Sequence, residues 1–252
     1  MSETAPDPVA AEVARADPDR FRAAMTAPPA ARPGLFALYA FNLEIARAPF
    51  VTQEAMIAQI RLRWWADAIA EIYAGETPRR HEVVEPLAAA IRAHDLPRGL
   101  FDGMIEARGL DIEPGAVSSP ALLDRYIAHT AGHLMELAAR LLGARGEALA
   151  AVRDFAQGAG IAVWLRALPE LAARGRPGPP GLDPAVFARD GLALIASARG
   201  RRAEVPAVAA PALLAGALAA PRLARAARGE SMELSEFRVR STFLLRGLSG
   251  RW

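Results

Sequence analysis

The helical spacing of apolar residues is the strongest constraint on how this chain folds. From about Asp19 onward, apolar residues recur every three or four positions, and runs of β-branched residues are few. This period places apolar side chains on one face of an α-helix, whereas a half-buried strand needs strict alternation. Apolar residues make up 52% of the chain but aromatic residues only 6%, so most of them are Ala and Leu, which favour helices. The pattern predicts an all-α protein.

Clusters of Pro and Gly separate the helical stretches, and none is long enough to link two domains. A chain of 252 residues also suits one domain. We therefore expect a flexible N-terminal arm over residues 1–18 and a single-domain bundle of about ten helices over residues 19–252. The predicted helices cover residues 18–26, 33–48, 53–74, 83–94, 98–108, 119–142, 147–173, 184–199, 211–227 and about 233–248.

The charged residues point to no class of partner. All 30 basic residues are Arg and are scattered among 28 acidic residues, so the formal net charge is +2. Neither nucleic-acid binding nor a basic stripe for anionic membranes is predicted. The absence of Cys excludes disulfides, thiolate nucleophiles and Cys-ligated zinc. The first 19 residues lack the basic start and apolar run of a signal peptide, so we expect a cytoplasmic protein.

Residues 205–221 carry no charge and are about as long as the shortest membrane-spanning helices. The segment contains three prolines and is mostly Ala, which makes it short and only weakly apolar. We therefore predict a buried helix that begins at or near Pro211.

Arg61 interrupts an apolar face of the predicted helix over residues 53–74. The members of that face at helical spacing are Ile57, Ile60, Trp64, Trp65, Ala68 and Ile72. A buried Arg needs a carboxylate, an anionic ligand or several carbonyls as partners. We expect an ion pair with Glu44 or Glu106, and a ligand-binding role is the alternative.

Two further pairs of side chains have spacings that suit metal ions. Asp67 and Glu71 lie four residues apart on that helix, but Arg63 precedes Asp67 by four, so a ladder of surface charges explains all three. His129 and His133 have the histidine spacing of an H-E-x-x-H zinc site, but the Glu is missing. We predict no metal ligands.

Short segments along the chain resemble, in order, the motifs of the squalene/phytoene synthase family. They are residues 35–41 (LFALYAF), 61–65 (RLRWW), 72–75 (IYAG), Tyr126 with Ala131 and Gly132, Leu165 with Arg166, and 174–176 (RGR). The resemblance runs from about Asp19 to Asp190. It implies the isoprenoid-synthase fold.

Active members of the family carry Asp residues one turn apart on two helices, and these hold Mg²⁺ that neutralises the departing diphosphate. The residues that stand at the two motifs here include Ala46, Arg47 and Phe50 at the first, and Ala167, Glu170 and Leu171 at the second. Only Glu170 offers a carboxylate, and Pro169 should disturb the second helix. The resemblance therefore implies degenerate motifs with no catalytic residue.

Other residues remain candidates for a ligand pocket in a chain without that chemistry. They are Tyr39, Arg47, Arg61, Glu71, Tyr126 and Arg166. Arg47 and Arg166 could bind a diphosphate directly, since guanidinium groups match phosphate oxygens. That arrangement would bind without catalysing.

A further set of residues resembles the non-catalytic subfamily that includes the mitochondrial complex I assembly factor with a phytoene synthase-like domain. The matches are residues 41–47 (FNLEIAR), 61–65 (RLRWW), Asp67, 71–73 (EIY), Pro78, His81, Val84, 94–96 (HDL) and 107–108 (AR). The resemblance implies a bacterial pseudoenzyme without a cofactor, peripheral to the inner membrane. Its partners would be respiratory complex I subunits or an isoprenoid or lipid ligand.

The alternative is an active prenyltransferase with a rearranged site. Such an enzyme would join two prenyl diphosphates head to head in isoprenoid biosynthesis, and it would require Mg²⁺.

Overall fold

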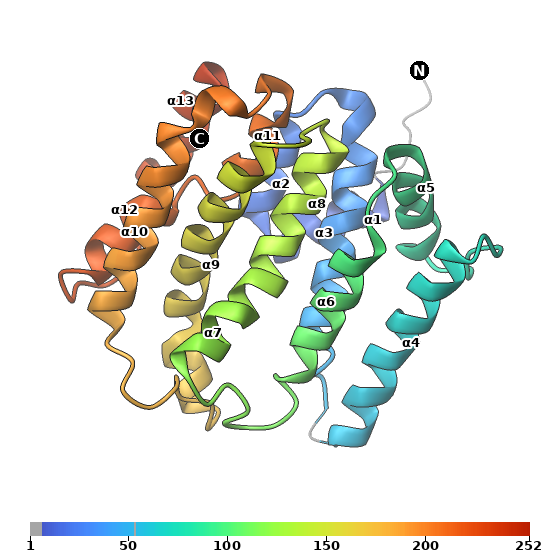
Figure 1. The fold of residues 1–252 in the computed structure, drawn as a ribbon, viewed down its shortest axis with the longest axis horizontal. Helices are drawn as coiled ribbons and strands as arrows, with labels where there is room; N and C mark the ends of the chain where they lie inside the picture. Colours follow the sequence, from blue (N-terminus) through green and yellow to red (C-terminus); the bar gives the residue numbers. More distant parts are fainter. Residues whose placement is uncertain (1–6, 53) are drawn as a thin grey trace.

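The computed structural model describes residues 7–52 and 54–252, and every regular element within them is helical, with no β-strand. The all-α prediction is confirmed. The elements are α1 (Pro8–Ala16), α2 (Pro18–Met25), α3 (Arg32–Arg47), α4 (Ala55–Tyr73), α5 (Val84–His94), α6 (Arg98–Gly109), α7 (Pro120–Ile127), α8 (His133–Leu141), α9 (Ala148–Ala173), α10 (Pro184–Gly200), α11 (Ala210–Leu214), α12 (Ala219–Ala226) and α13 (Glu236–Ser249). The helices form one bundle (Figure 1).

The predicted flexible arm over residues 1–18 is wrong for the part that the structure describes. Asp7 caps α1 by accepting a hydrogen bond from the Val9 N–H at 2.9 Å, and Pro8 occupies the first helical position. Val9 and Val13 are buried, and α1 packs against α3. Asp7 at the N-cap and Pro8 at the first helical position are sequence signals for the start of a helix. Residues 1–6 lie outside the described residues.

Two predicted helices are divided. The stretch predicted over residues 119–142 contains α7 and α8, joined by one π-helical segment, Ala128–Gly132. The stretch predicted over residues 211–227 breaks after Leu214, so that α11 and α12 are separate helices. These two breaks and the additional helix α1 explain why the described residues contain thirteen α-helices and not the expected ten.

The uncharged segment near Pro211 is buried, as predicted: Pro211, Leu213 and Leu214 of α11 face the interior. No single helix in the described residues is both long and apolar enough to cross a membrane. One bent pair, Ala207–Leu214 with Ala219–Ala226, meets the length and composition criteria jointly, with an angle of 42° between its halves.

Helix α9 runs through the middle of the bundle (Figure 1) and is apolar around most of its circumference. Such a helix must be covered on all sides, and α7, α8, α10, α11 and α12 pack around it. Two of these contacts are made at glycines of α9. A Cβ atom on Gly158 would lie 2.6 Å from the carbonyl oxygen of Gly191 in α10, and one on Gly160 would lie 2.4 Å from Ile127 Cγ2. The side chains of α9 and its neighbours therefore leave almost no space at the centre.

We predict that Gly158→Ala lowers the free energy of unfolding by about 1–3 kcal/mol, because the new methyl group meets backbone that cannot rotate away. Gly99→Ala in α6 is the matched control. A Cβ atom there meets nothing within 4 Å. Alanine lowers the conformational entropy of the unfolded chain, and this effect alone should stabilise the folded protein by about 0.5–1 kcal/mol. Urea unfolding measures both, and a Gly158→Ala variant as stable as the parent would contradict the close α9–α10 contact.

Candidate functional site

The segments equated with the two diphosphate motifs come together at one end of the bundle. Helices α3 and α9 both end in the lower half of Figure 1. Phe50 lies just beyond α3, and the guanidinium carbons of Arg174 and Arg176, just beyond α9, lie 5.8 and 5.0 Å from its ring centroid. Cations at these distances are attracted by the face of the ring. The place expected to collect carboxylates therefore presents two arginines around an aromatic ring.

Arg47, the other candidate of the first motif, is paired with Glu12 of α1. The hydrogen bond from Arg47 is the main reason that the pKa of Glu12 lies below its ordinary value. The Arg47–Glu12 pair could not be predicted, because no local sequence signal places α1 against α3. Arg47 is consequently not a free cation awaiting a diphosphate.

Glu170, the one carboxylate of the second motif, is exposed and pairs with Arg174 one turn later, at 2.7 Å. Its neighbours Ala167 and Leu171 add no ligand atoms to the site. The expectation that Pro169 disturbs this helix is wrong, because α9 continues through Pro169 to Ala173. Proline fixes a helical φ and removes one hydrogen bond, a loss that an exposed position near the helix end tolerates.

Arg61 is exposed, which corrects the prediction of a buried, paired arginine. The buried stripe of α4 contains Ala58, Leu62 and Trp65, while Ile60 is 61% exposed. The helical phase was misread because α4 has apolar residues on two faces. Arg61 lies at the rim of a surface hollow together with Glu44, without forming an ion pair with it.

Asp67 and Glu71 are held by arginines, so they do not form a shared metal site. Arg63 pairs with Asp67 at 2.8 Å, as the predicted charge ladder requires. Glu71 instead accepts two hydrogen bonds from Arg79, at 2.6 and 2.7 Å, and these lower its pKa. Among residues 7–52 and 54–252, no group of three or more His, Asp and Glu side chains is placed to hold a metal ion.

Tyr126 is part of a buried polar cluster. Its hydroxyl donates to Asp111 Oδ2 at 2.8 Å and accepts from Arg108, which also donates to Asp111 at 3.1 Å. Burial raises the pKa of the Tyr126 phenol. The hydroxyl therefore joins α7 to α6 and the turn after it. Tyr126 also lines a small hollow of about 60 Å³ together with Glu106 and His129.

Tyr39 lines the central cavity between α3, α8, α9 and α11, and no described residue forms a hydrogen bond with its hydroxyl. The cavity measures about 40 Å³, and apart from Arg20, Tyr39 and Arg222 its lining is Ala, Gly, Leu, Met and Val. That volume suits about one water molecule. Sequence reasoning missed Arg20 and Arg222, which belong to no recognisable motif. Arg166, a predicted pocket residue, is exposed. Burial, and then the positive charge of Arg166, lowers the pKa of Arg222 in α12.

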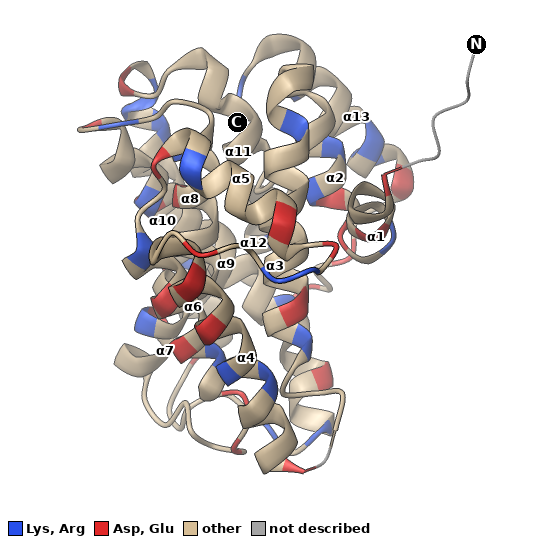
Figure 2. Cartoon of the chain, turned by 90° about the vertical axis from the view of Figure 1, so that its right-hand side faces the viewer, with Lys and Arg blue, Asp and Glu red and all other residues tan. Residues whose placement is uncertain are grey.

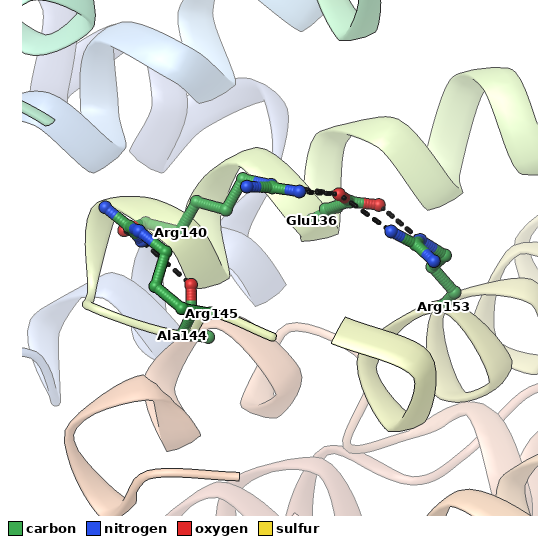
Figure 3. A network of polar contacts seen from close by, with 5 residues as sticks. All are labelled: Glu136, Arg140, Ala144, Arg145 and Arg153. Carbon is green, nitrogen blue, oxygen red and sulfur yellow. Dashed lines mark hydrogen bonds and ion pairs between the residues drawn. The ribbon is translucent and has the colours of Figure 1, made fainter. Parts of the chain in front are cut away.

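The buried carboxylate of Glu136 is the centre of an ionic network with two arginines, which no sequence motif indicates (Figure 3). Arg140 donates to Oε1 at 2.7 and 2.9 Å, and Arg153 of α9 donates to Oε2 at 2.7 Å. Burial alone would raise the pKa of Glu136, but these hydrogen bonds outweigh it and hold the pKa below 4.5. Arg145 extends the network through the carbonyls of Arg140 and Ala144.

His129 and His133 stack beside this network, with ring centroids 4.7 Å apart. The Nδ1 atom of His133 lies 3.1 Å from the Leu100 carbonyl oxygen, and burial, then the charge of His129, lowers its pKa. Because Glu136 is already held by two arginines, no carboxylate joins the two imidazoles as a zinc ligand.

Comparison with known proteins gives consistent results for sequence and fold. The model of the squalene/phytoene synthase family matches residues 13–178. A crystal structure of a dehydrosqualene synthase in complex with ligand has a TM-score of 0.81 at 14% identity, over 96% of this chain and 94% of that one. Squalene synthase HpnC from Alicyclobacillus acidocaldarius has a TM-score of 0.69 at 16% identity, over 96% and 93%. The isoprenoid-synthase fold is confirmed.

The similar curated proteins have a different name. NADH dehydrogenase (ubiquinone) complex I, assembly factor 6 from Bos taurus is 27% identical over 161 residues, which is 64% of this chain and 48% of that protein. The protein of the same name from Homo sapiens is 26% identical over 159 residues, or 63% and 47%. The match thus spans about half the length of these relatives.

We predict that Glu136→Ala lowers the free energy of unfolding by about 1–3 kcal/mol at pH 7, because Arg140 and Arg153 lose the carboxylate that they surround. Glu170→Ala, which removes an exposed pair, should cost less than about 0.5 kcal/mol. Because the pKa of Glu136 is lowered in the fold, its stabilising effect should be complete above pH 4.5 and should disappear as the pH falls below that value. Urea unfolding from pH 7 to 3 tests this, and equal losses in the two variants would contradict it.

Proposed function

Because the chain belongs to the squalene/phytoene synthase family, we propose that it is a non-catalytic member that assists the assembly of respiratory complex I. The relatives named complex I assembly factor 6 support this role at 26–29% identity over about half of their length. Their name is the reason to prefer complex I as the partner. The chemistry of the two helix ends is the reason to set catalysis aside.

The observation that carries the proposal is the pairing of charges at the ends of α3 and α9. Prenyl diphosphates ionise when Mg²⁺ held by carboxylates neutralises the leaving diphosphate. Here Arg47 faces Glu12, Glu170 faces Arg174, and Phe50 lies against Arg174 and Arg176. Three of these six residues are cations, which repel Mg²⁺, and the single motif carboxylate, Glu170, already has a partner.

Direct binding of diphosphate by arginine is the main rival within this site. Arg47 and Arg174 are engaged in ion pairs, so a diphosphate would have to displace Glu12 and Glu170. Binding of that kind would also leave the departing group without a metal. It would therefore give a binding protein and not an enzyme.

An isoprenoid or lipid ligand in the central cavity is a second rival. Sites for small molecules typically measure about 300–1,000 Å³, whereas the cavity beside Tyr39 measures about 40 Å³. A prenyl chain would have to separate α9 from α8 and α11, which pack against it. We therefore favour a protein partner that binds the outside of the bundle, at the cytoplasmic surface of the inner membrane.

The first test is chemical. We expect the purified protein to release no pyrophosphate from farnesyl diphosphate or geranylgeranyl diphosphate in the presence of Mg²⁺, because Glu170, the one carboxylate at the two motifs, is paired with Arg174. Product analysis by chromatography and a pyrophosphate assay measure this. Turnover that disappears in Glu170→Gln or Glu71→Gln would support the prenyltransferase alternative.

The second test is genetic and addresses the partner. Deleting the gene in its native host should lower assembled, membrane-bound NADH dehydrogenase activity and leave isoprenoid products unchanged. Both the parent gene and the Glu170→Ala variant should restore the activity, because the proposed role does not use the one remaining motif carboxylate. Normal complex I in the deletion strain, or rescue by the parent gene alone, would count against the proposal.

A further inference from the structure

The outward face of α13 carries large apolar side chains that nothing in the bundle covers. Four of them are among the most exposed apolar residues in the described part of the chain: Phe237 at 83%, Leu248 at 80%, Leu245 at 66% and Leu244 at 62%. Their helix lies at the upper end of the bundle in Figures 1 and 2 and packs against α2 and α11. So much exposed apolar surface on one element marks a binding surface.

The helical phase collects these side chains into a stripe. The edge of α13 that contacts the bundle contains Val239 and Phe243, which are buried. At about 100° per residue, Phe237, Leu244 and Leu248 project within roughly 40° of one another on the opposite side. Helix α13 is therefore apolar along two opposite edges, and the bundle covers only one of them.

Positive charge flanks the stripe on both sides. Arg238 and Arg240 project about 80° to either side of its centre, and both are exposed. The only acidic residue of α13 is Glu236, which lies beside the edge facing the bundle and pairs with Arg240 at 3.4 Å. Arginine stems of this kind can lie along an apolar surface while their heads reach a polar one.

A second group of positive charges lies behind α13, and its partners are incomplete. Arg199, Arg202 and Arg246 each have a buried N–H group with no hydrogen-bond partner in the described residues. The main-chain oxygen of Trp252 accepts from Arg199 at 3.1 Å and from Arg202 at 2.6 Å. Burial, with the charges of Arg246 and Arg202, lowers the pKa of Arg199 to about 10, which reflects this crowding.

We propose that α13 docks the protein on an anionic phospholipid surface, with Phe237, Leu244 and Leu248 in the acyl boundary and Arg238 and Arg240 at the level of the phosphates. An apolar stripe with an exposed arginine on each side suits a helix that lies in the plane of such a membrane. A second copy of this chain fits poorly, because pairing two stripes would bring arginines against arginines. An acidic protein could also pair with Arg238 and Arg240, so the test must distinguish binding to lipid from binding to such a protein.

The dispersal of arginines along the sequence had predicted no basic stripe for anionic membranes, and the structure changes that expectation. The stripe becomes visible only when the bundle is seen to cover the opposite edge of α13. The inference is independent of the complex I proposal. A protein that docks on lipid but leaves complex I unchanged would keep this inference and remove the other.

The test is co-sedimentation of the full chain with two kinds of vesicle, one of phosphatidylcholine alone and one containing about one third phosphatidylglycerol. We expect binding to the anionic vesicles only, weakened by added salt. The double variant Leu244→Ser/Leu248→Ser should reduce the partition coefficient at least about tenfold, and Arg238→Gln/Arg240→Gln should reduce it on anionic vesicles.

The matched control is Met56→Ser/Ile60→Ser, which removes two exposed apolar side chains (71% and 61%) from α4 and should leave binding unchanged. Since all these side chains are exposed, unfolding curves should match the parent and exclude misfolding as the cause. No sedimentation with anionic vesicles, or an equal loss in the α4 control, would overturn the proposal. So would dimers that the α13 variants abolish, or capture of an acidic protein in place of lipid.

Discussion

The close packing around α9 is the constraint on which the rest of the structure depends. Because that helix is apolar around most of its circumference, it must be covered on most sides. Its glycines bring it close to the backbone of α10 and to the Ile127 side chain of α7. The central cavity beside Tyr39 therefore measures only about 40 Å³. A centre filled in this way leaves little room for a bound small molecule beside Tyr39.

The charged side chains at the ends of α3 and α9 also leave little opportunity for a ligand to bind. Four charged residues at the two motifs have a partner of opposite charge or an aromatic ring: Arg47 has Glu12, Glu170 has Arg174, and Arg174 and Arg176 have Phe50. Surface ion pairs contribute little to stability, but they occupy the positions where metal ligands would be needed. Buried N–H groups without a hydrogen-bond partner in the described residues also occur away from this end, at Arg199, Arg202 and Arg246.

Much of the fold could be predicted from the sequence, because helical periodicity and the Pro and Gly breaks are local signals. The phase of α4 could not, since its apolar residues occupy two faces, and Ile60 was placed inside in the position that Leu62 takes. Pairings between distant segments, such as Arg47 with Glu12 and Arg153 with Glu136, carry no local signal either. The motif residues were identified from sequence, but their partners required the structure.

The central claim is that the ends of α3 and α9 do not form a Mg²⁺-diphosphate site. Calorimetric titration with unreactive farnesyl thiodiphosphate, with Mg²⁺ and then with a chelator in its place, tests this most directly. Our account predicts the same weak isotherm in both conditions, since no set of carboxylates holds the metal. Tight binding that requires Mg²⁺ and disappears in Glu170→Gln would contradict it.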